Sequence, residues 1–269
     1  MTEPSIREYR ETDVPAMAKL WQEVFGDPAE LTDFFFALLP RLGTAVVAAE
    51  GEKLLGVTCV LDDLALAEKD SVKKAAYLYA VMTHPEARGL GLGAALCQAA
   101  RTLALRRGCG VVCTSPASES LYGWYGRILD FAPALHCKRL CVPASASETL
   151  RALSAEEYRL LREDMLAGRP HLRLGKAAAE YEAFLCALDG GGLYAVSSGI
   201  CAACREDGRC ILHEVIAPEG DAAAIAAAAA AHLGAPEAEV ALPCPEGEAY
   251  LAAPAGSFPP DCVWNLIFD

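Results

Sequence analysis

The sequence is short of positive charge. Among its 269 residues, Lys and Arg number 23 and Asp and Glu number 36, which gives a formal net charge of −13 at pH 7. A nucleic-acid-binding protein needs a basic surface to displace the counterions of the phosphate backbone. We therefore expect no nucleic-acid partner, and the acidic balance favours a cationic partner wherever the partner is charged.

Long hydrophobic runs are also missing. The longest nearly unbroken apolar stretch, residues 222–233, has twelve residues, whereas a membrane-spanning helix needs roughly 20. The first eight residues lack the apolar segment of a signal peptide. Because 54 % of the residues are hydrophobic, the chain is nevertheless too apolar to be disordered. We expect a soluble, globular, cytoplasmic protein with no membrane partner.

Twelve cysteines are present, but they do not predict disulfide bonds. Disulfide scaffolds are typically short secreted chains, so we expect reduced thiols here. The densest group, Cys201-x2-Cys204-x5-Cys210-x2-His213, has a spacing that a zinc site could use. A tight turn at residues 207–208 argues against that reading, because it pairs residue 205 with Cys210 and turns Cys204 away from Cys201 and Cys210. We expect packed thiols and no metal.

Hydrophobic periodicity predicts strands and helices in both halves of the chain. The expected strands cover residues 5–9, 44–49, 53–61, 74–83, 110–114, 134–142, 193–196, 199–205, 209–217 and 238–242. The expected helices cover residues 13–25 and 31–42, a segment from a glycine-rich turn to about residue 107, a segment beginning at residue 116, helix-like stretches before residue 188, and residues 221–233.

This pattern favours an α/β protein with mixed sheets and two domains. Small residues around 143–149 indicate a linker, so we expect one domain at 1–142, a linker at 143–150 and a second domain at 151–269. The two halves share a weak internal repeat in the order strand, Pro-Glu, Ala-rich helix, Gly, strand, Pro.

The glycine-rich turn at residues 88–93, Arg-Gly-Leu-Gly-Leu-Gly, predicts an anion site. A helix N-terminus exposes unpaired N–H groups and the positive end of the helix dipole. Glycines at 89, 91 and 93 leave that backbone open to a phosphate, and Arg88 adds a cation. The second copy of the repeat has Gly-Asp-Ala at residues 220–222, and its carboxylate repels phosphate. We therefore expect one pyrophosphate site per chain.

Two other nucleotide-binding motifs fit this turn poorly. Gly89-x-Gly91-x-x-Ala94 superficially meets the dinucleotide fingerprint, but four residues separate the strand from the first glycine. No acidic residue lies between Ala94 and Pro116, where that fingerprint requires one. No Walker motif is present. An ordinary strand-to-helix turn stays as the alternative without a ligand.

Residues 79–93, Tyr-Ala-Val-Met-Thr-His-Pro-Glu-Ala-Arg-Gly-Leu-Gly-Leu-Gly, resemble the coenzyme A motif of the GNAT family of N-acetyltransferases. Residues 88–93 match its Arg/Gln-x-x-Gly-x-Gly/Ala core, and the resemblance covers roughly residues 4–142. It implies a GNAT acyl-CoA N-acyltransferase fold followed by a smaller, degenerate GNAT-like domain. It also implies acetyl-CoA as cosubstrate, no metal, and acetyl transfer to a primary amine of a small molecule or peptide.

The resemblance also implies the cofactor-binding residues. A sheet splayed after the motif strand would let pantetheine pair with the main chains of Val81 and Thr83, while the glycine turn lines the pyrophosphate. The implied set is Val81, Met82, Thr83, Arg88, Gly89, Leu90, Gly91, Leu92, Gly93 and Ala94. The competing interpretation is an acyl-CoA-binding regulatory module that binds the cofactor without turnover.

In the same family a tyrosine after the next strand protonates the departing thiolate, and Tyr125 is the best match. A phenol with an ordinary pKa of about 10 suits that role. Tyr122 stays an alternative, because Asp130-Phe131 closes the segment one residue later than the family's Gly-Phe.

The two-half layout and the ending at residues 264–269 are similar to tandem GNAT proteins of the Eis type. The resemblance makes the α-carboxylate of Asp269 a candidate base, against a last strand that ends at the surface. The aromatic residues of 34–36, with Trp21 and Phe25, are candidates for an acceptor pocket or for core packing. An oligomer is possible.

Overall fold

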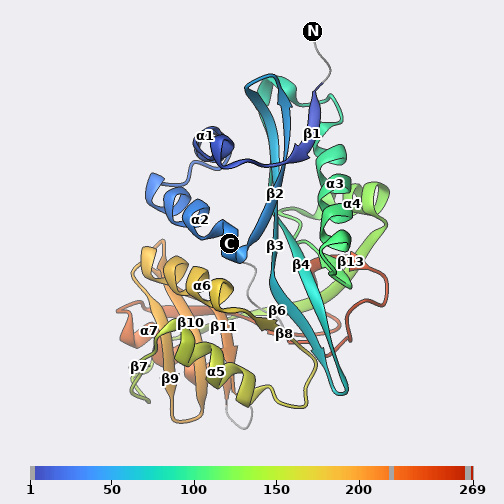
Figure 1. Cartoon of the computed structure of the whole chain (residues 1–269). Helices are drawn as coiled ribbons and strands as arrows, with labels where there is room; N and C mark the ends of the chain where they lie inside the picture. Colours follow the sequence, from blue (N-terminus) through green and yellow to red (C-terminus); the bar gives the residue numbers. More distant parts are fainter. Residues whose placement is uncertain (1–3, 218–220, 264–267, 269) are drawn as a thin grey trace. The chain divides into compact units, whose positions relative to one another are not determined.

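The computed structural model describes residues 4–217, 221–263 and 268 (Figure 1). The chain divides into two compact units. The first contains Met1–Ala65, Lys73–Ala134 and Leu251–Phe258, and the second contains Leu66–Val72, Leu135–Tyr250 and Pro259–Asp269. No helix within the described ranges is both long enough and apolar enough to cross a membrane.

The first unit is built on a sheet in the order β1-β2-β3-β4-β5. Its elements in chain order are β1 (Ser5–Glu8), η1 (Glu11–Asp13), α1 (Val14–Phe25), α2 (Ala29–Leu42), β2 (Gly43–Glu50), β3 (Lys53–Glu68), β4 (Ser71–Thr83), η2 (Pro85–Ala87), α3 (Leu92–Arg106), β5 (Val111–Cys113) and α4 (Glu119–Leu129). The β1–β2 and β2–β3 pairs are antiparallel, and β4 and β5 are parallel.

Helices cover both faces of this sheet. Figure 1 shows α1 and α2 on one side of β2 and β3, and α3 and α4 on the other. A strand buried on both faces reads as a continuous apolar run rather than an alternating one. This explains β2, where all residues except the last are buried. The core beneath α3 includes Val46, Ala76, Leu96, Ala100 and Val112.

The second unit is built on a sheet in the order β13-β6-β12-β11-β10-β9-β7. The elements that follow α4 in the chain are β6 (Phe131–Pro143), β7 (Arg151–Ala152), α5 (Ala155–Met165), β8 (His171–Leu174), α6 (Lys176–Leu188), β9 (Gly192–Val196), β10 (Gly199–Glu206), β11 (Arg209–Ile216), α7 (Ala222–His232), β12 (Glu237–Pro243) and β13 (Glu248–Pro254). The start of β6 and the end of β13 belong to the first unit, and the rest belong to the second. Strands β9, β10 and β11 are antiparallel neighbours, and β11 and β12 are parallel.

A buried ion pair links α5 to β11. Arg162 and Glu214 are both 0 % exposed, and the guanidinium Nε and Nη2 lie 2.8 and 2.9 Å from the two carboxylate oxygens. The Tyr158 hydroxyl donates to the same carboxylate at 2.9 Å, and Arg162 also donates to the carbonyl of Leu172 at 2.6 Å. Because both charges are paired and hydrogen-bonded, the unit can bury them.

The predicted repeat in element order is confirmed. Strand β4, helix α3 and strand β5 form one strand–helix–strand repeat with a parallel strand pair, and β11, α7 and β12 form the other. The predicted mixed α/β fold is therefore present in both units.

The division between the units differs from the expected linker at 143–150. Strand β6 runs through Ala134 and Leu135, where the first unit gives way to the second. Its residues 137–143 pair with β12 in the second sheet. The last strand expected of the first domain therefore contributes to the second sheet, because its edge is completed by a strand more than 90 residues further along the chain.

Candidate active site

The site begins where β4 and β5 separate. Their parallel pairing runs from Ala75 and Val111 to Tyr77 and Cys113. The next residue, Thr114, instead exchanges two backbone hydrogen bonds with Ala252 of β13, at 2.9 and 2.8 Å. The last residues of β4 therefore leave the ladder with β5, and their backbone groups on that edge need another partner.

The backbone of β4 shows which residues face the open edge. The His84 N–H donates to the Leu55 carbonyl of β3 at 2.9 Å. The Met82 carbonyl also faces β3, because a Cβ built on Gly56 would lie 2.9 Å from it. Backbone groups alternate between the two edges of a strand, so Val81 and Thr83 direct theirs away from β3. This is the side from which β5 has turned away.

The glycine turn leaves the N-terminus of α3 open. Gly89 and Gly91 take φ values of +81° and +77°, the left-handed region that favours glycine. A Cβ built at either position meets no atom within 4 Å. Leu92 and Ala87 are buried on either side and anchor the turn, while Arg88 is exposed. The turn thus presents bare backbone and one guanidinium to its surroundings.

The helix start lies close to the end of β4. A Cβ on Gly93 would lie 3.6 Å from both the Thr83 hydroxyl and the Trp124 ring. The first intrahelical acceptor at this end, the Gly91 carbonyl, is used by Ala95 at 3.1 Å. The preceding N–H groups of the first turn have no partner in the helix, which makes them suited to an anion.

Tyr125 lies in α4 near the point where the strands part. Its side chain is 5 % exposed, and its ring is 4.8 Å from that of Trp124. Its hydroxyl interacts with that of Thr114, which donates to the Leu78 carbonyl at 2.9 Å. Burial and the nearby Cys97 raise the pKa of Tyr125 to about 12, so the phenol is protonated at neutral pH.

Tyr122 is one turn earlier on α4 and is half-buried. The choice between Tyr122 and Tyr125 was undecided because the segment closes one residue later than in the family. The structure explains this spacing at Asp130, which ends α4 in a left-handed conformation with φ +58°. Glycine is the usual residue at such a helix end, and Asp is among the few others that tolerate it. The segment therefore ends as a glycine would end it, one position later.

The remaining candidates are the aromatic residues proposed for an acceptor pocket and the proposed base Asp269. Trp21 and Phe35 are 2 % and 0 % exposed, with ring centroids 4.8 Å apart, and both contact Tyr79 of β4. They are core, whereas Phe25 is 47 % exposed. Asp269, the candidate base, lies outside the residues that the structure describes.

The cysteine hairpin of the second unit has the expected register. Arg205 pairs with Cys210, and Cys201 and Cys210 belong to the hydrophobic cluster beneath α7. Cys204 faces the other side of the sheet, where its sulfur lies 3.2 Å from His213 Nε2. All twelve cysteines are free thiols.

Comparisons with known proteins agree with this geometry. Residues 5–127 match the model of the acetyltransferase (GNAT) domain. These residues form a GNAT acetyltransferase domain. The match supports an acyltransferase, and these residues have the fold that the sequence resemblance implied.

Solved structures share the fold over most of the chain. A protein of unknown function from Enterococcus faecalis V583, described as a probable N-acyltransferase, is 14 % identical, with 94 % of this chain and 72 % of that one covered and a TM-score of 0.69. A GCN5-related N-acetyltransferase from Kribbella flavida is 16 % identical, with 93 % and 71 % covered and a TM-score of 0.67.

Eis1 from Mycobacterium abscessus is also similar, at 16 % identity and a TM-score of 0.62, with 88 % of this chain and 64 % of Eis1 covered. At these identities the likeness concerns the fold. No curated protein matches the sequence of this chain.

In the GNAT domain, sequence reasoning missed Thr114. Its hydroxyl contacts both the open end of β4 and the phenol of Tyr125. Thr114 also marks the position where β5 leaves β4. Its position at the end of a short apolar strand indicated a strand end near the site. Its pairing with β13 could not be expected, because β13 was not predicted.

Proposed function

We propose that the protein is an N-acetyltransferase that moves an acetyl group from acetyl-CoA to a primary amine by direct transfer. One observation supports this most strongly. The open glycine turn at Gly89 and Gly91, the end of β4 beyond its ladder with β5 and the buried phenol of Tyr125 occur together in the GNAT domain.

The N–H groups of residues 89–94 bind the diphosphate in this proposal, and Arg88 supplies an additional cation. The open backbone permits this, since a Cβ at Gly89 or Gly91 would occupy otherwise empty space. Leu92 and Met82 are buried and hold the turn and the strand in place. The main chains of Val81 and Thr83 pair with the pantetheine amides, which replace the missing partners of the splayed strand.

The chemistry then requires one new bond and one broken bond. The neutral amine attacks the thioester carbon, the C–N bond forms, and the C–S bond breaks to release the CoA thiolate. Tyr125 donates its hydroxyl proton toward the departing sulfur, and because its pKa is raised by burial, it is in the protonated form that this role needs. The proton lost by the amine passes to a base, for which the α-carboxylate of Asp269 is the candidate.

The acceptor is proposed to be a small molecule or peptide whose amine is cationic before it loses its proton. The formal net charge of −13 supports this by attracting cations. The free thiols support a reducing, cytoplasmic location, because disulfides form in oxidising compartments.

The test combines binding and turnover. Calorimetry with acetyl-CoA, CoA and NAD should show heat with the first two and none with NAD. The release of free thiol is then followed with acetyl-CoA and a panel of polyamines, amino sugars and peptide amines. Tight binding without thiol release across the panel would favour a regulatory acyl-CoA-binding module, and no binding at all would contradict the proposed site. A chain ending at Phe268 tests the base, since it moves the terminal carboxylate by one residue.

A further inference from the structure

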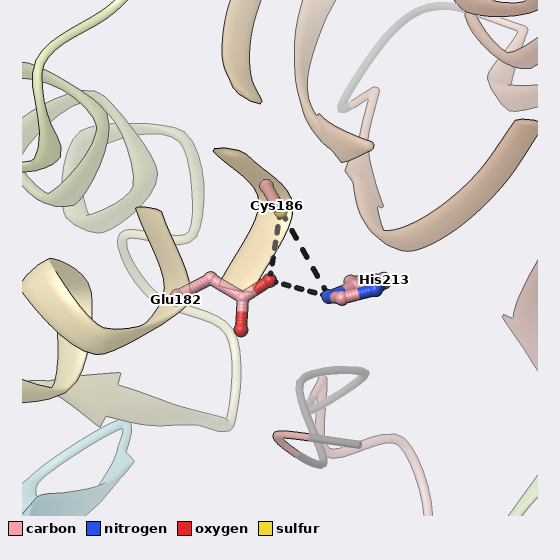
Figure 2. A group of neighbouring side chains, drawn as sticks. All are labelled: Glu182, Cys186 and His213. Atoms are coloured by element: carbon pink, nitrogen blue, oxygen red, sulfur yellow. Dashed lines mark hydrogen bonds and ion pairs between the residues drawn. The ribbon is translucent and has the colours of Figure 1, made fainter. Parts of the chain in front are cut away.

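The second unit brings a carboxylate, a thiol and an imidazole together (Figure 2). Glu182 and Cys186 are one turn apart on α6, so their side chains share a helix face. His213 reaches them from β11. His213 Nδ1 lies 2.8 Å from Glu182 Oε1 and 3.9 Å from Cys186 Sγ, and that sulfur lies 3.4 Å from the same oxygen.

Two of these three separations are close to those around a tetrahedral metal ion. Bond lengths of about 2.3 Å to sulfur and about 2.0–2.2 Å to nitrogen and oxygen place tetrahedral ligands about 3.4–3.6 Å apart. The two distances to sulfur, 3.4 and 3.9 Å, lie near that range. The 2.8 Å contact between His213 and Glu182 must open by about 0.6 Å, which a side-chain adjustment provides.

One oxygen of Glu182 could serve as a further metal ligand. Glu182 is 0 % exposed, and its Oε2 has no hydrogen-bond partner among the residues that the structure describes. A buried carboxylate oxygen without a partner costs free energy. A divalent ion held by Oε1 would satisfy Oε2 by taking it as a further ligand, and the carboxylate and the Cys186 thiolate would together balance the two positive charges of the ion.

A fourth side chain orients the imidazole. The Nε2 atom of His213 lies 3.2 Å from the sulfur of Cys204, which in turn lies 3.5 Å from Glu206 Oε1. With Nδ1 bound to a metal, Nε2 carries the proton and donates it to Cys204. Histidine ligands commonly donate their second N–H in this way, and this contact fixes the orientation of the ring.

We propose that Glu182, Cys186 and His213 bind one divalent transition-metal ion of the zinc type, and that Cys204 positions the histidine. Three protein ligands of mixed oxygen, sulfur and nitrogen character leave a fourth position for water or the second oxygen of Glu182. The sequence expectation of no metal rested on the hairpin cysteines. This ligand set instead joins α6 to β11, and nothing in the cysteine spacing showed it.

The test uses the full chain, stripped of metal with a chelator and titrated with Co²⁺ as a spectroscopic probe. We expect a thiolate-to-cobalt charge-transfer band that saturates at one equivalent and disappears when Zn²⁺ is added. Cys186→Ser should remove the band, and Glu182→Gln should weaken binding. Cys204→Ser should keep the band and lower the affinity by about 10–100-fold. Cys141→Ser, which changes an exposed cysteine of the same unit, is the matched control and should bind as the wild type does.

Two outcomes would overturn the proposal. One is the absence of stoichiometric cobalt or zinc binding. The other is a band that survives Cys186→Ser and is lost in Cys204→Ser, because that result would assign the metal to the neighbouring group of Cys204, Glu206 and His213. Far-ultraviolet circular dichroism checks that each variant folds. If Cys186→Ser is misfolded, Cys186→Ala and Glu182→Gln decide the question.

Discussion

The glycine turn permits a test that separates backbone strain from cofactor binding. Gly91 caps α3 at φ +77°, and a Cβ there would meet no atom within 4 Å. In Gly91→Ala the added methyl group therefore causes no clash within the protein. It forces a residue with a side chain into the left-handed region, which costs about 1–2 kcal/mol.

Gly108 is the matched control. It follows the other end of α3 at φ +86°, and a Cβ there also meets nothing within 4 Å. Gly108→Ala should therefore lower the free energy of unfolding by the same 1–2 kcal/mol or so. Urea unfolding followed by circular dichroism measures both variants, and we expect them to lose similar stability.

The two variants should differ in cofactor binding. If the amides at the start of α3 bind the diphosphate, the methyl group of Gly91→Ala occupies the space where a phosphate oxygen must approach. We expect a loss of at least about tenfold in acetyl-CoA affinity, or 1.4 kcal/mol, whereas Gly108→Ala should bind normally. Calorimetry at matched fractions of folded protein measures this. Equal affinities in both variants and the wild type would refute the assignment of the turn.

Three further predictions concern single side chains. Tyr125→Phe should lower kcat by about 10²–10⁴-fold, while Tyr122→Phe should leave kcat nearly unchanged. Because burial raises the pKa of Tyr125 to about 12, the wild-type rate should not fall through loss of this acid until the pH nears 12. A fall near pH 10 would contradict the assignment of Tyr125 as the acid. Glu214→Gln takes the bidentate partner from the buried Arg162, which keeps a longer 3.7 Å contact with Glu163, and should cost about 3–5 kcal/mol in urea unfolding. Glu239→Gln, in exposed pairs with two arginines, should cost about 0–1 kcal/mol, and similar costs for the two variants would refute the burial argument. Burial favours a higher pKa for Asp62, but hydrogen bonds from one arginine and one lysine outweigh this effect and hold the pKa below its usual value. This carboxylate should therefore stabilise the fold above pH 4 and lose that effect as the pH falls further. Asp62→Asn should reduce the fall of the urea midpoint at acidic pH, and an unchanged fall would contradict the argument.

Much of the first unit follows from local sequence patterns. The start of β1 at Ser5 and the end of α1 at Phe25 match the predicted segments, because strand alternation and an apolar helix face are local signals. Gly108 lies just after α3 with a positive φ, as a helix-ending glycine should. The start of α4 is different. The predicted start at residue 116 is wrong, since α4 begins at Glu119 after the N-cap Ser118.

Pairing between distant segments could not be predicted in this way. Strand β13 (Glu248–Pro254) has no strong alternation, and its role depends on Thr114, more than 130 residues earlier. The same limit applies to Glu182 and Cys186 of α6, whose neighbour His213 is on a strand. Hydrophobic periodicity predicts which face of an element is buried, but not which residues meet across that face.

The candidate cofactor site was predictable because most of it is contiguous. The end of β4, the turn and the first residues of α3 occupy 81–94, so the motif and the structural element coincide. The separation of β4 from β5 was an implication of the family resemblance, and the structure shows its local cause in the two hydrogen bonds between Thr114 and Ala252. Tyr125 lies at the same fork, although its action on sulfur stays a prediction.

The two copies of the repeat differ at the point that decides phosphate binding. Asp221 is the N-cap of helix α7, and its carboxylate accepts a hydrogen bond from the N–H of Ala223 at 2.8 Å. This side chain both satisfies an amide of the first turn and places a negative charge at the positive end of the helix dipole. A diphosphate that approached α7 would have to displace the hydrogen bond between Asp221 and Ala223, and the carboxylate of Asp221 would repel it. The N-cap of helix α3 is Gly91, and within the described residues no side chain caps this helix. Its amides can be satisfied by an external anion, so of the two strand–helix–strand repeats only the one with α3 is suited to the proposed diphosphate site.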